Sequence, residues 1–222
     1  MIAAMNMIRR LERRLESMLD GVVGTVFRGQ LHPSELAGRI IREADLTGVQ
    51  TQDGTVVPNR YVLVVNPDDL EGHSPPPELR HELAVLVEEL ALERGWRLEG
   101  PAEVVVITNR EVTHGSPRCD GQFVEGPRAA WARLVGDTTI AVTVNRAVVG
   151  RGSEADVTIP SQHVSRRHAL LWKQDGRLMV QDLGSSNGTR VDGVRVDHRP
   201  TEVPTAAVLT FGDTSYRFVE AI

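Results

Sequence analysis

Short apolar runs separated by turns fill the second half of the chain, and this pattern constrains the fold more than any other feature. About ten such runs, each three to seven residues long, follow one another between residues 131 and 221. Turn-forming pairs such as Asp175-Gly176 and Asp192-Gly193 lie between them. Many short strands joined by turns favour a sandwich, so we predict an all-β sandwich over residues 128–222. Its expected strands are 131–136, 138–144, 147–150, 156–159, 169–174, 177–183, 189–191, 194–196, 207–212 and 215–221.

The first half carries longer periodic segments. Apolar residues recur at helical spacing over 7–20, 33–46 and 74–95, and the runs 60–65 and 102–108 are typical of strands. Less regular segments complete this half: a turn-rich connection at 47–59 and possible short strands at WRLEG (96–100) and GQFVEG (121–126). The order of these elements predicts a compact α+β domain over residues 1–125. We therefore expect a multidomain protein, with a short hinge before the sandwich.

Charge and composition exclude several classes of protein. Residues 1–127 hold 13 arginines and 20 acidic residues, a net charge of −7, whereas residues 128–222 have a net charge of +2. Neither half is basic enough for a general nucleic-acid binder. No run approaches the about 20 apolar residues of a membrane span, and we find no secretory signal at the N-terminus. The single cysteine, Cys119, permits no internal disulfide, so we expect a cytoplasmic protein.

The first half shows no motif of catalysis or metal binding. The segment 21–30 contains glycines but lacks the Gly-Lys-Ser/Thr ending of a phosphate-binding loop. Its histidines are scattered without metal-ligand spacing: His32, His73, His81 and His114. Cys119 lies in an expected loop, where a catalytic thiol remains an alternative. The basic run RRLERR is expected to be a solvated helix face rather than a membrane or nucleic-acid patch. We predict no cofactor and no metal.

Three polar loops stand at strand edges in the second half: 150–152 (GRG), 165–168 (SRRH) and 184–189 (GSSNGT). The third loop holds more polar side chains than a hairpin turn requires, because two turn residues already suffice to join strands. Gly184, Asn187 and Gly188 also tolerate positive φ angles. These polar and turn-forming residues indicate a loop that binds a ligand.

The three loops, in this order on a sandwich, resemble those of a forkhead-associated (FHA) domain. The resemblance covers roughly 128–222 and implies a β-sandwich whose loops at one end bind phosphothreonine peptides. It also implies the binding residues, among which Asn187 would hold the peptide main chain and Ser186 would shape the phosphate site: Arg151, Ser165, Arg166, Ser186 and Asn187. By the same resemblance three residues serve the loop structure: Gly150, His168 and Gly188.

The chemistry of these residues agrees with a phosphate ligand. A phosphothreonine carries nearly two negative charges and three strong acceptor oxygens. Arg151 can offer a permanently charged, bidentate fork, Ser165 a hydroxyl, and the loop N–H groups further donors. We expect Arg167 and Arg190 to face solvent, and the alternative is that these additional cations near the rim steer acidic peptides. One departure from the family pattern is the segment 201–211, which lacks the glycine that often precedes the penultimate strand.

The first half resembles the N-terminal domain of actinobacterial FHA proteins of the FhaA kind, known as DUF3662. The likeness lies in RRLERRLE, VFRGQLHPSELAGRIIREAD, VPNRYVLVVNPDDL and LAVLVEELALERGWRL, and it covers about 1–125. It brings no catalytic motif.

The leading hypothesis is a non-enzymatic signalling adaptor for phosphothreonine-containing proteins. The resemblance implies bacterial Ser/Thr kinase signalling in cell-wall synthesis or division, with a kinase or its substrates as partners. We expect a cytoplasmic protein that neither binds nucleic acid nor inserts into membranes, although partners at the inner face of the membrane would recruit it. Two alternatives stay open: a hydrolase that uses Ser165 and His168 or Cys119, and a scaffold that acts through its first half.

Overall fold

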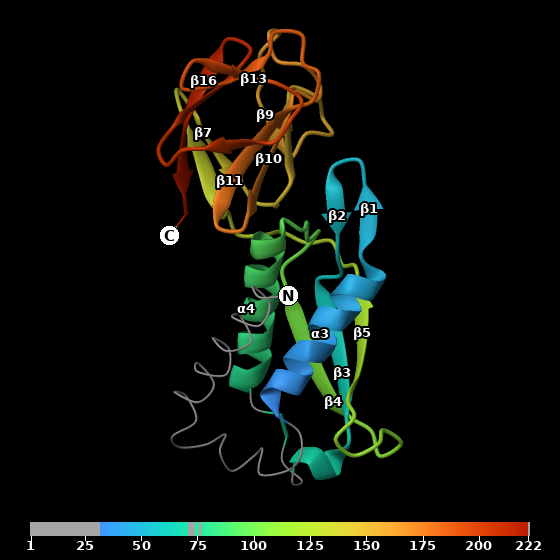
Figure 1. Cartoon of the computed structure of the whole chain (residues 1–222). Helices are drawn as coiled ribbons and strands as arrows, with labels where there is room; N and C mark the ends of the chain where they lie inside the picture. Colours follow the sequence, from blue (N-terminus) through green and yellow to red (C-terminus); the bar gives the residue numbers. More distant parts are fainter. Residues whose placement is uncertain (1–31, 71–73, 76, 222) are drawn as a thin grey trace. The chain divides into compact units, whose positions relative to one another are not determined.

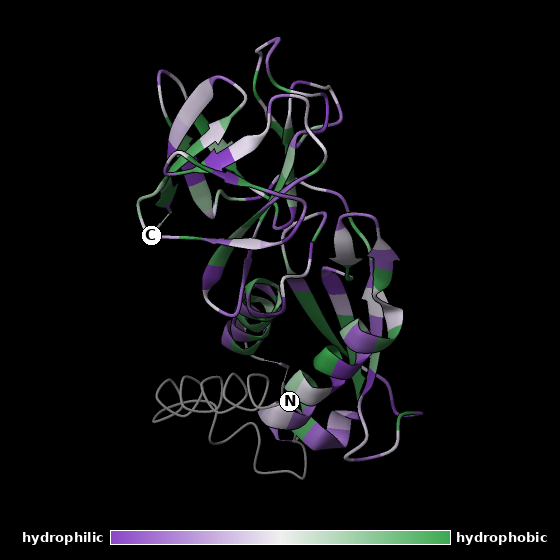
Figure 2. Cartoon of the chain, turned by 45° about the horizontal axis from the view of Figure 1, so that its top comes forward, coloured by the Kyte–Doolittle hydropathy of each residue, from purple (hydrophilic) through white to green (hydrophobic). Residues whose placement is uncertain are grey.

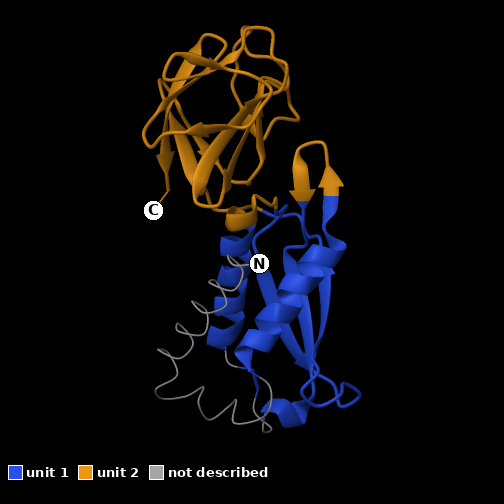
Figure 3. Cartoon of the chain, in the orientation of Figure 1, with its two compact units in different colours: residues 1–49, 56–91, 98–126 blue, residues 50–55, 92–97, 127–222 orange. Residues whose placement is uncertain are grey.

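The computed structural model describes residues 32–70, 74–75 and 77–221 (Figure 1). The predicted helix 7–20, the segment 21–30 and His73 lie outside the described residues. The chain divides into two compact units (Figure 3). Of the described residues, the first holds those within 32–49, 56–91 and 98–126, and the second holds those within 50–55, 92–97 and 127–221.

The first unit is an α+β domain with a three-stranded sheet in the order β4-β3-β5. Strand β3 (Arg60–Val65) lies in the centre, parallel to β4 (Glu103–Thr108) and antiparallel to β5 (Arg118–Gln122). The helices are α3 (Pro33–Thr47), α4 (Pro77–Arg94) and a 3-10 helix (Pro67–Leu70). Helix α4 lies in the crossover between the parallel strands β3 and β4, which need such a long connection. This unit confirms the predicted α+β fold of the first half.

Local chemistry explains where these elements begin and what they bury. Pro33 opens α3, at a position where a helix does not use the missing N–H group. The helix then buries an apolar stripe that includes Leu36 and Ile40. Alternate residues of β3 are buried, among them Tyr61 and Leu63, as expected for a strand with two different faces.

Three expectations for the first half are wrong. WRLEG is not a strand, because Arg97 alone forms a bridge there, with its N–H donating to the Thr55 carbonyl at 2.9 Å. The strand expected within GQFVEG begins earlier, at residue 118, so Cys119 lies in β5 and not in a loop. The turn-rich connection contains an unexpected hairpin, β1 (Val49–Thr51) with β2 (Gly54–Val56). Gly54 closes it with a φ of 122°, a conformation that glycine adopts readily.

The second unit contains the predicted sandwich of two sheets. One sheet has the order β13-β12-β15-β16-β6-β7 and the other the order β14-β11-β10-β8-β9. The strands are β6 (Ala132–Val135), β7 (Thr139–Val142), β8 (Ala147–Gly150), β9 (Val157–Thr158), β10 (Ala169–Gln174), β11 (Arg177–Asp182), β12 (Thr189–Val191), β13 (Val194–Val196), β14 (Thr201–Val203), β15 (Val208–Phe211) and β16 (Thr214–Glu220). Every expected strand is present, and β14 is an addition.

A single apolar cluster lies between the two sheets of the sandwich. Fully buried members include Leu134, Leu171, Leu209 and Phe211, which come from strands of both sheets. The strands of both units carry many of the hydrophobic residues, coloured green in Figure 2. In strands such as β6 and β11, buried apolar side chains alternate with more exposed ones, as expected for a sandwich. Strands β8 and β10 are buried on both faces, because Val148, Leu170 and Trp172 form a second apolar cluster.

The segment without the family's glycine still forms a turn before β15. The N–H of Ala207 donates to the Pro204 carbonyl at 3.1 Å, and Ala206 takes a φ of 60°. A non-glycine residue in this left-handed conformation costs about 1–2 kcal/mol. The chain therefore makes the turn with an alanine under local strain.

Candidate functional site

A cavity of about 690 Å³ lies within the second unit, where the three polar loops meet. Its lining comprises residues 151–154, 162–167, 186 and 187. The structure thus brings together around one cavity the five residues expected to bind a phosphopeptide: Arg151, Ser165, Arg166, Ser186 and Asn187. Three residues are buried and do not line it: Gly150, His168 and Gly188.

Main-chain hydrogen bonds hold the first two loops side by side. The N–H of Arg151 donates to the Ser165 carbonyl at 3.0 Å, and the N–H of Gly152 donates to the Arg166 carbonyl at 3.1 Å. A Cβ atom on Gly150 would stand 2.1 Å from the Arg166 carbonyl oxygen, far inside van der Waals contact. The close approach of the two loops therefore requires a glycine at position 150.

His168 joins the second loop to the third through both nitrogens of its fully buried ring. The N–H of Ser165 donates to Nδ1 at 3.0 Å, so Nδ1 is unprotonated, and Nε2 then donates to the Gly188 carbonyl at 3.1 Å. Burial lowers the pKa of His168, although the Gly188 carbonyl and Asp182 act in the opposite direction. Both nitrogens bind main-chain groups, so this imidazole is not placed as a base for the Ser165 hydroxyl.

Asp182 organises the third loop from the end of β11. Its carboxylate accepts hydrogen bonds from the N–H groups of Gly184 and Ser185 and from the hydroxyls of Ser185 and Thr189, at 2.6 to 2.9 Å. Burial by itself raises the pKa of Asp182, but these hydrogen bonds outweigh it and hold the pKa below its usual value. The loop is thus fixed on an ionised carboxylate.

Two hydrogen bonds also join the third loop to residues 163 and 165 at the cavity. The N–H of Ser186 donates to the Ser165 hydroxyl oxygen at 3.1 Å, which leaves the hydroxyl hydrogen available to another acceptor. The Asn187 amide donates to the His163 carbonyl at 2.8 Å, and its side-chain oxygen can still accept. Arg151 and Arg166 are exposed at the same rim. The arrangement presents cationic and hydroxyl donors to an anion.

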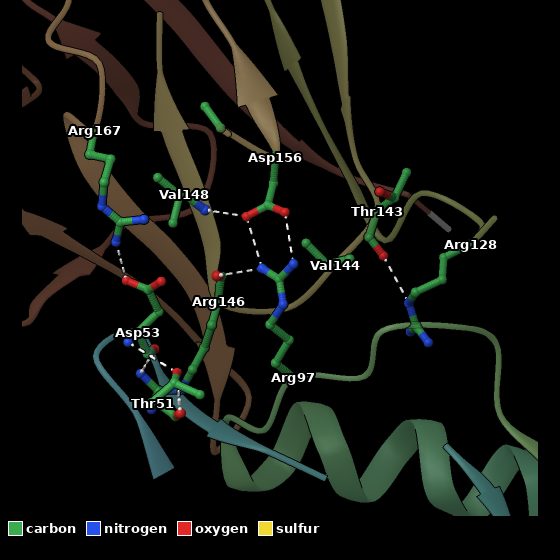
Figure 4. Close-up of polar contacts among 12 residues, drawn as sticks. Thr51, Asp53, Arg97, Arg128, Thr143, Val144, Arg146, Val148, Asp156 and Arg167 are labelled. Atoms are coloured by element: carbon green, nitrogen blue, oxygen red, sulfur yellow. Dashed lines mark hydrogen bonds and ion pairs between the residues drawn. The ribbon is translucent and has the colours of Figure 1, made fainter. Parts of the chain in front are cut away.

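Arg167, which sequence reasoning placed in solvent, is half-buried and forms an ion pair with Asp53 (Figure 4). Both residues belong to the second unit, yet they are 114 positions apart in the chain. Asp53 stands in the Asp-Gly pair of the missed hairpin, so a hairpin signal was present, but nothing in the sequence indicated its partner. Arg190, the other extra cation, is not among the residues that line the cavity.

The remaining candidates do not form a reactive centre. Burial first, with Glu43 and Asp120 adding to it, raises the pKa of the Cys119 thiol to about 12, so the thiol is protonated at neutral pH. Among the described residues no group of His, Cys, Asp and Glu is arranged to hold a metal ion. None of the helices in the described part of the chain has the length and apolar character needed to cross a membrane.

Comparison with known families identifies both halves. Residues 8–120 match the N-terminal domain of FhaA, and residues 147–212 match the FHA domain. The chain belongs to the family of FHA domain-containing proteins. The three loops described above are those of its FHA domain, and the sandwich is the fold that this resemblance implied.

Individual relatives support the assignment. FhaA of Mycobacterium tuberculosis is 30% identical over 103 residues, which are 45% of this chain and 19% of FhaA. FhaB of Mycolicibacterium smegmatis is 31% identical over 136 residues, 61% of this chain and 79% of FhaB. The chain therefore matches about a fifth of the length of that FhaA.

Two solved structures align with the sandwich. An FHA domain from a study of phosphothreonine-dependent FHA interactions covers 41% of this chain and 95% of its own, with 24% identity and a TM-score of 0.37. The FHA domain of FhaA, crystallised with the intracellular domain of another protein, covers 39% of this chain and 96% of its own, with 25% identity and a TM-score of 0.35. These scores are low, and the family membership rests on the sequence matches.

Proposed function

We propose that this protein is a non-enzymatic signalling adaptor whose residues 128–222 bind phosphothreonine-containing proteins. The observation that carries the proposal is the convergence of Arg151, Ser165, Arg166 and Asn187 on one cavity. Ser186 and the loop N–H groups complete the set of donors. This combination matches a doubly charged, acceptor-rich phosphate, since arginine forms paired hydrogen bonds with phosphate oxygens.

Each donor has a distinct role in the proposed complex. Arg151 holds the phosphate through two N–H groups, Ser165 donates its hydroxyl to a phosphate oxygen, and Arg166 supplies a second charge beside it. Asn187 offers both a donor and an acceptor to the main chain of an extended peptide. Gly150, His168 and Gly188 set the positions of the loops and touch no ligand.

The expected affinity suits a reversible adaptor. A hydrogen bond to a charged group contributes about 1.5–3 kcal/mol, and ordering the peptide offsets part of the sum. Two or three such bonds correspond to binding at roughly micromolar concentrations. This strength allows exchange as a kinase and a phosphatase alter the partner.

The proposal includes the biological setting that the family membership supports. The partners are Ser/Thr kinases or their phosphorylated substrates in a bacterium, in processes of cell-wall synthesis or division. The protein is cytoplasmic and is recruited to the inner face of the membrane by such partners. Catalysis is not part of this function, because the His168 ring is engaged by main-chain groups and the Cys119 thiol is protonated.

Calorimetry with three matched peptides tests the proposal. The full chain is titrated with one sequence that contains phosphothreonine, phosphoserine or unmodified threonine at the same position. We expect micromolar binding of the phosphothreonine peptide and no measurable binding of the unmodified one. Arg151→Ala abolishes binding, whereas Arg133→Ala, which removes an exposed arginine from β6 outside the cavity lining, leaves it unchanged. Equal affinity for all three peptides would refute the function.

A further inference from the structure

The second unit contains more than the sandwich. Two earlier segments, 50–55 and 92–97, belong to it (Figure 3). Arg97 donates two hydrogen bonds to Asp156, each 2.8 Å long, and Asp156 also accepts the N–H of Val148 (Figure 4). Arg146 donates to the carbonyls of Gly95 and Asp53. Side chains and main chain of the added segments are thus bonded to the sandwich.

A further contact between an added segment and the sandwich involves a residue of the proposed phosphopeptide site. Arg167 lines the cavity, and its guanidinium donates to the carboxylate of Asp53 (Figure 4). The exposed fractions of the two side chains are 37% for Arg167 and 19% for Asp53, so water screens this pair less than a fully exposed one. The charge of Arg167 is therefore largely compensated before any ligand binds.

The charges around the cavity then divide into two groups. Three arginines line the cavity, Arg151, Arg166 and Arg167, and Glu154 is the one acidic residue among the described residues that line it. A phosphothreonine of nearly two negative charges matches Arg151 and Arg166. Arg167 would be the remaining cation for an acidic residue beside the phosphothreonine, but Asp53 already occupies it.

We propose that Asp53 determines the specificity of this site by masking Arg167, so that the site takes phosphothreonine peptides with neutral rather than acidic flanking residues. The inference rests on the proposed function and names the class of peptide that the site accepts. Without Asp53, the freed guanidinium attracts a carboxylate of the peptide. With Asp53 in place, an acidic flank finds no unpaired cation at Arg167 and is repelled by Glu154.

The variant Asp53→Asn tests the inference in the full chain. It removes the charge and retains the main-chain carbonyl that accepts from Arg146, so the segment 50–55 stays attached. The control is Asp137→Asn, which changes the net charge equally in the β6–β7 turn, outside the cavity lining. Each protein is titrated with two phosphothreonine peptides, one with alanine and glutamine flanks and one with glutamate flanks.

We expect Asp53→Asn to bind the acidic peptide about threefold to fivefold more tightly than the wild type, as for one surface ion pair. Its affinity for the neutral peptide changes by less than about twofold, and Asp137→Asn shows no selective gain. The gain disappears in the double variant Asp53→Asn with Arg167→Gln, and it shrinks as the salt concentration rises.

Two results would overturn the inference. In one, the affinity of Asp53→Asn for the acidic peptide equals that of the wild type or of Asp137→Asn. In the other, Asp53→Asn lowers the affinity for both peptides by the same factor, which would mean that Asp53 stabilises the site and does not mask the charge of Arg167. Failure of the proposed function looks different, since the wild type would then bind neither phosphopeptide.

Discussion

Replacing Asp182 probes the part of the site that has the densest network of hydrogen bonds. Its carboxylate accepts four of them, from two N–H groups and two hydroxyls, and Ser185 and Thr189 are themselves buried. In Asp182→Ala the two main-chain donors lose their acceptor, and the hydroxyls must find new partners in a space that water enters poorly. A buried donor without a partner costs about 1–3 kcal/mol.

The Gly184 N–H lies on an exposed residue and can bind water, whereas the Ser185 N–H and the Thr189 hydroxyl are buried. Loss of the acceptor for these two buried donors predicts a loss of about 3–5 kcal/mol in the free energy of unfolding of the second unit. Asp182→Asn should cost less, because its amide oxygen still accepts from the N–H groups and the hydroxyls can rotate to accept from its NH2 group. The expected order of stability is wild type, Asp182→Asn, Asp182→Ala. Asp137→Ala, which removes an exposed carboxylate, should stay within about 0.5 kcal/mol of the wild type.

Urea unfolding followed by tryptophan fluorescence measures this order. The three tryptophans, Trp96, Trp131 and Trp172, all lie in the second unit, so the signal reports on that unit. A loss below about 1 kcal/mol for Asp182→Ala would refute the reasoning, because one intact hydrogen bond already contributes that much. Equal losses for the alanine and asparagine variants would also contradict it.

Three further predictions concern single residues. Burial holds the pKa of His168 below its ordinary 6.5, so the unfolded chain takes up a proton at a higher pH than the folded chain does. The stability that this ring contributes is therefore complete above pH 6.5 and declines as the pH falls toward the folded pKa, and urea midpoints measured against pH should show this decline. Gly150→Ala should weaken phosphopeptide binding at least about tenfold in calorimetry, because the added Cβ pushes the Arg166 carbonyl away. The control Gly38→Ala has open space around it in α3, so it should leave the affinity unchanged and add up to about 1 kcal/mol to the free energy of unfolding. Cys119 should react slowly with iodoacetamide at pH 8 in the folded protein and rapidly in urea; fast labelling of the folded chain would contradict the raised thiol pKa.

Sequence reasoning predicted the sandwich well because its information is local. Strands such as Ala169–Gln174 and Arg177–Asp182 are apolar runs that flank an Asp-Gly turn, and each feature is readable within about a dozen residues. Strand β14 was missed because Thr201–Val203 offers three residues with a single apolar side chain. The error at WRLEG has a tertiary cause, since that segment bonds to Thr55 and to the sandwich instead of forming a strand of its own.

For the candidate site, too, the sequence predicted some features and not others. The residue types of the three loops indicated the donors, because polar groups beyond the needs of a turn are visible in the sequence. Their environments were not visible. The neutral state of His168 depends on two main-chain contacts, and the state of Arg167 depends on a carboxylate that precedes it by 114 positions. No local pattern encodes such a pairing, so the charge balance of the cavity follows only from the fold.

Nuclear magnetic resonance of the isotope-labelled full chain tests the central claim most directly. The chain is titrated with a phosphothreonine peptide and, separately, with its unmodified parent. The account predicts that the phosphopeptide shifts the amide signals of residues 150–152, 165–168 and 184–188 together with the Arg151 side-chain signal, and that the parent shifts none of them. Shifts centred on another surface, or the same shifts with both peptides, would contradict it.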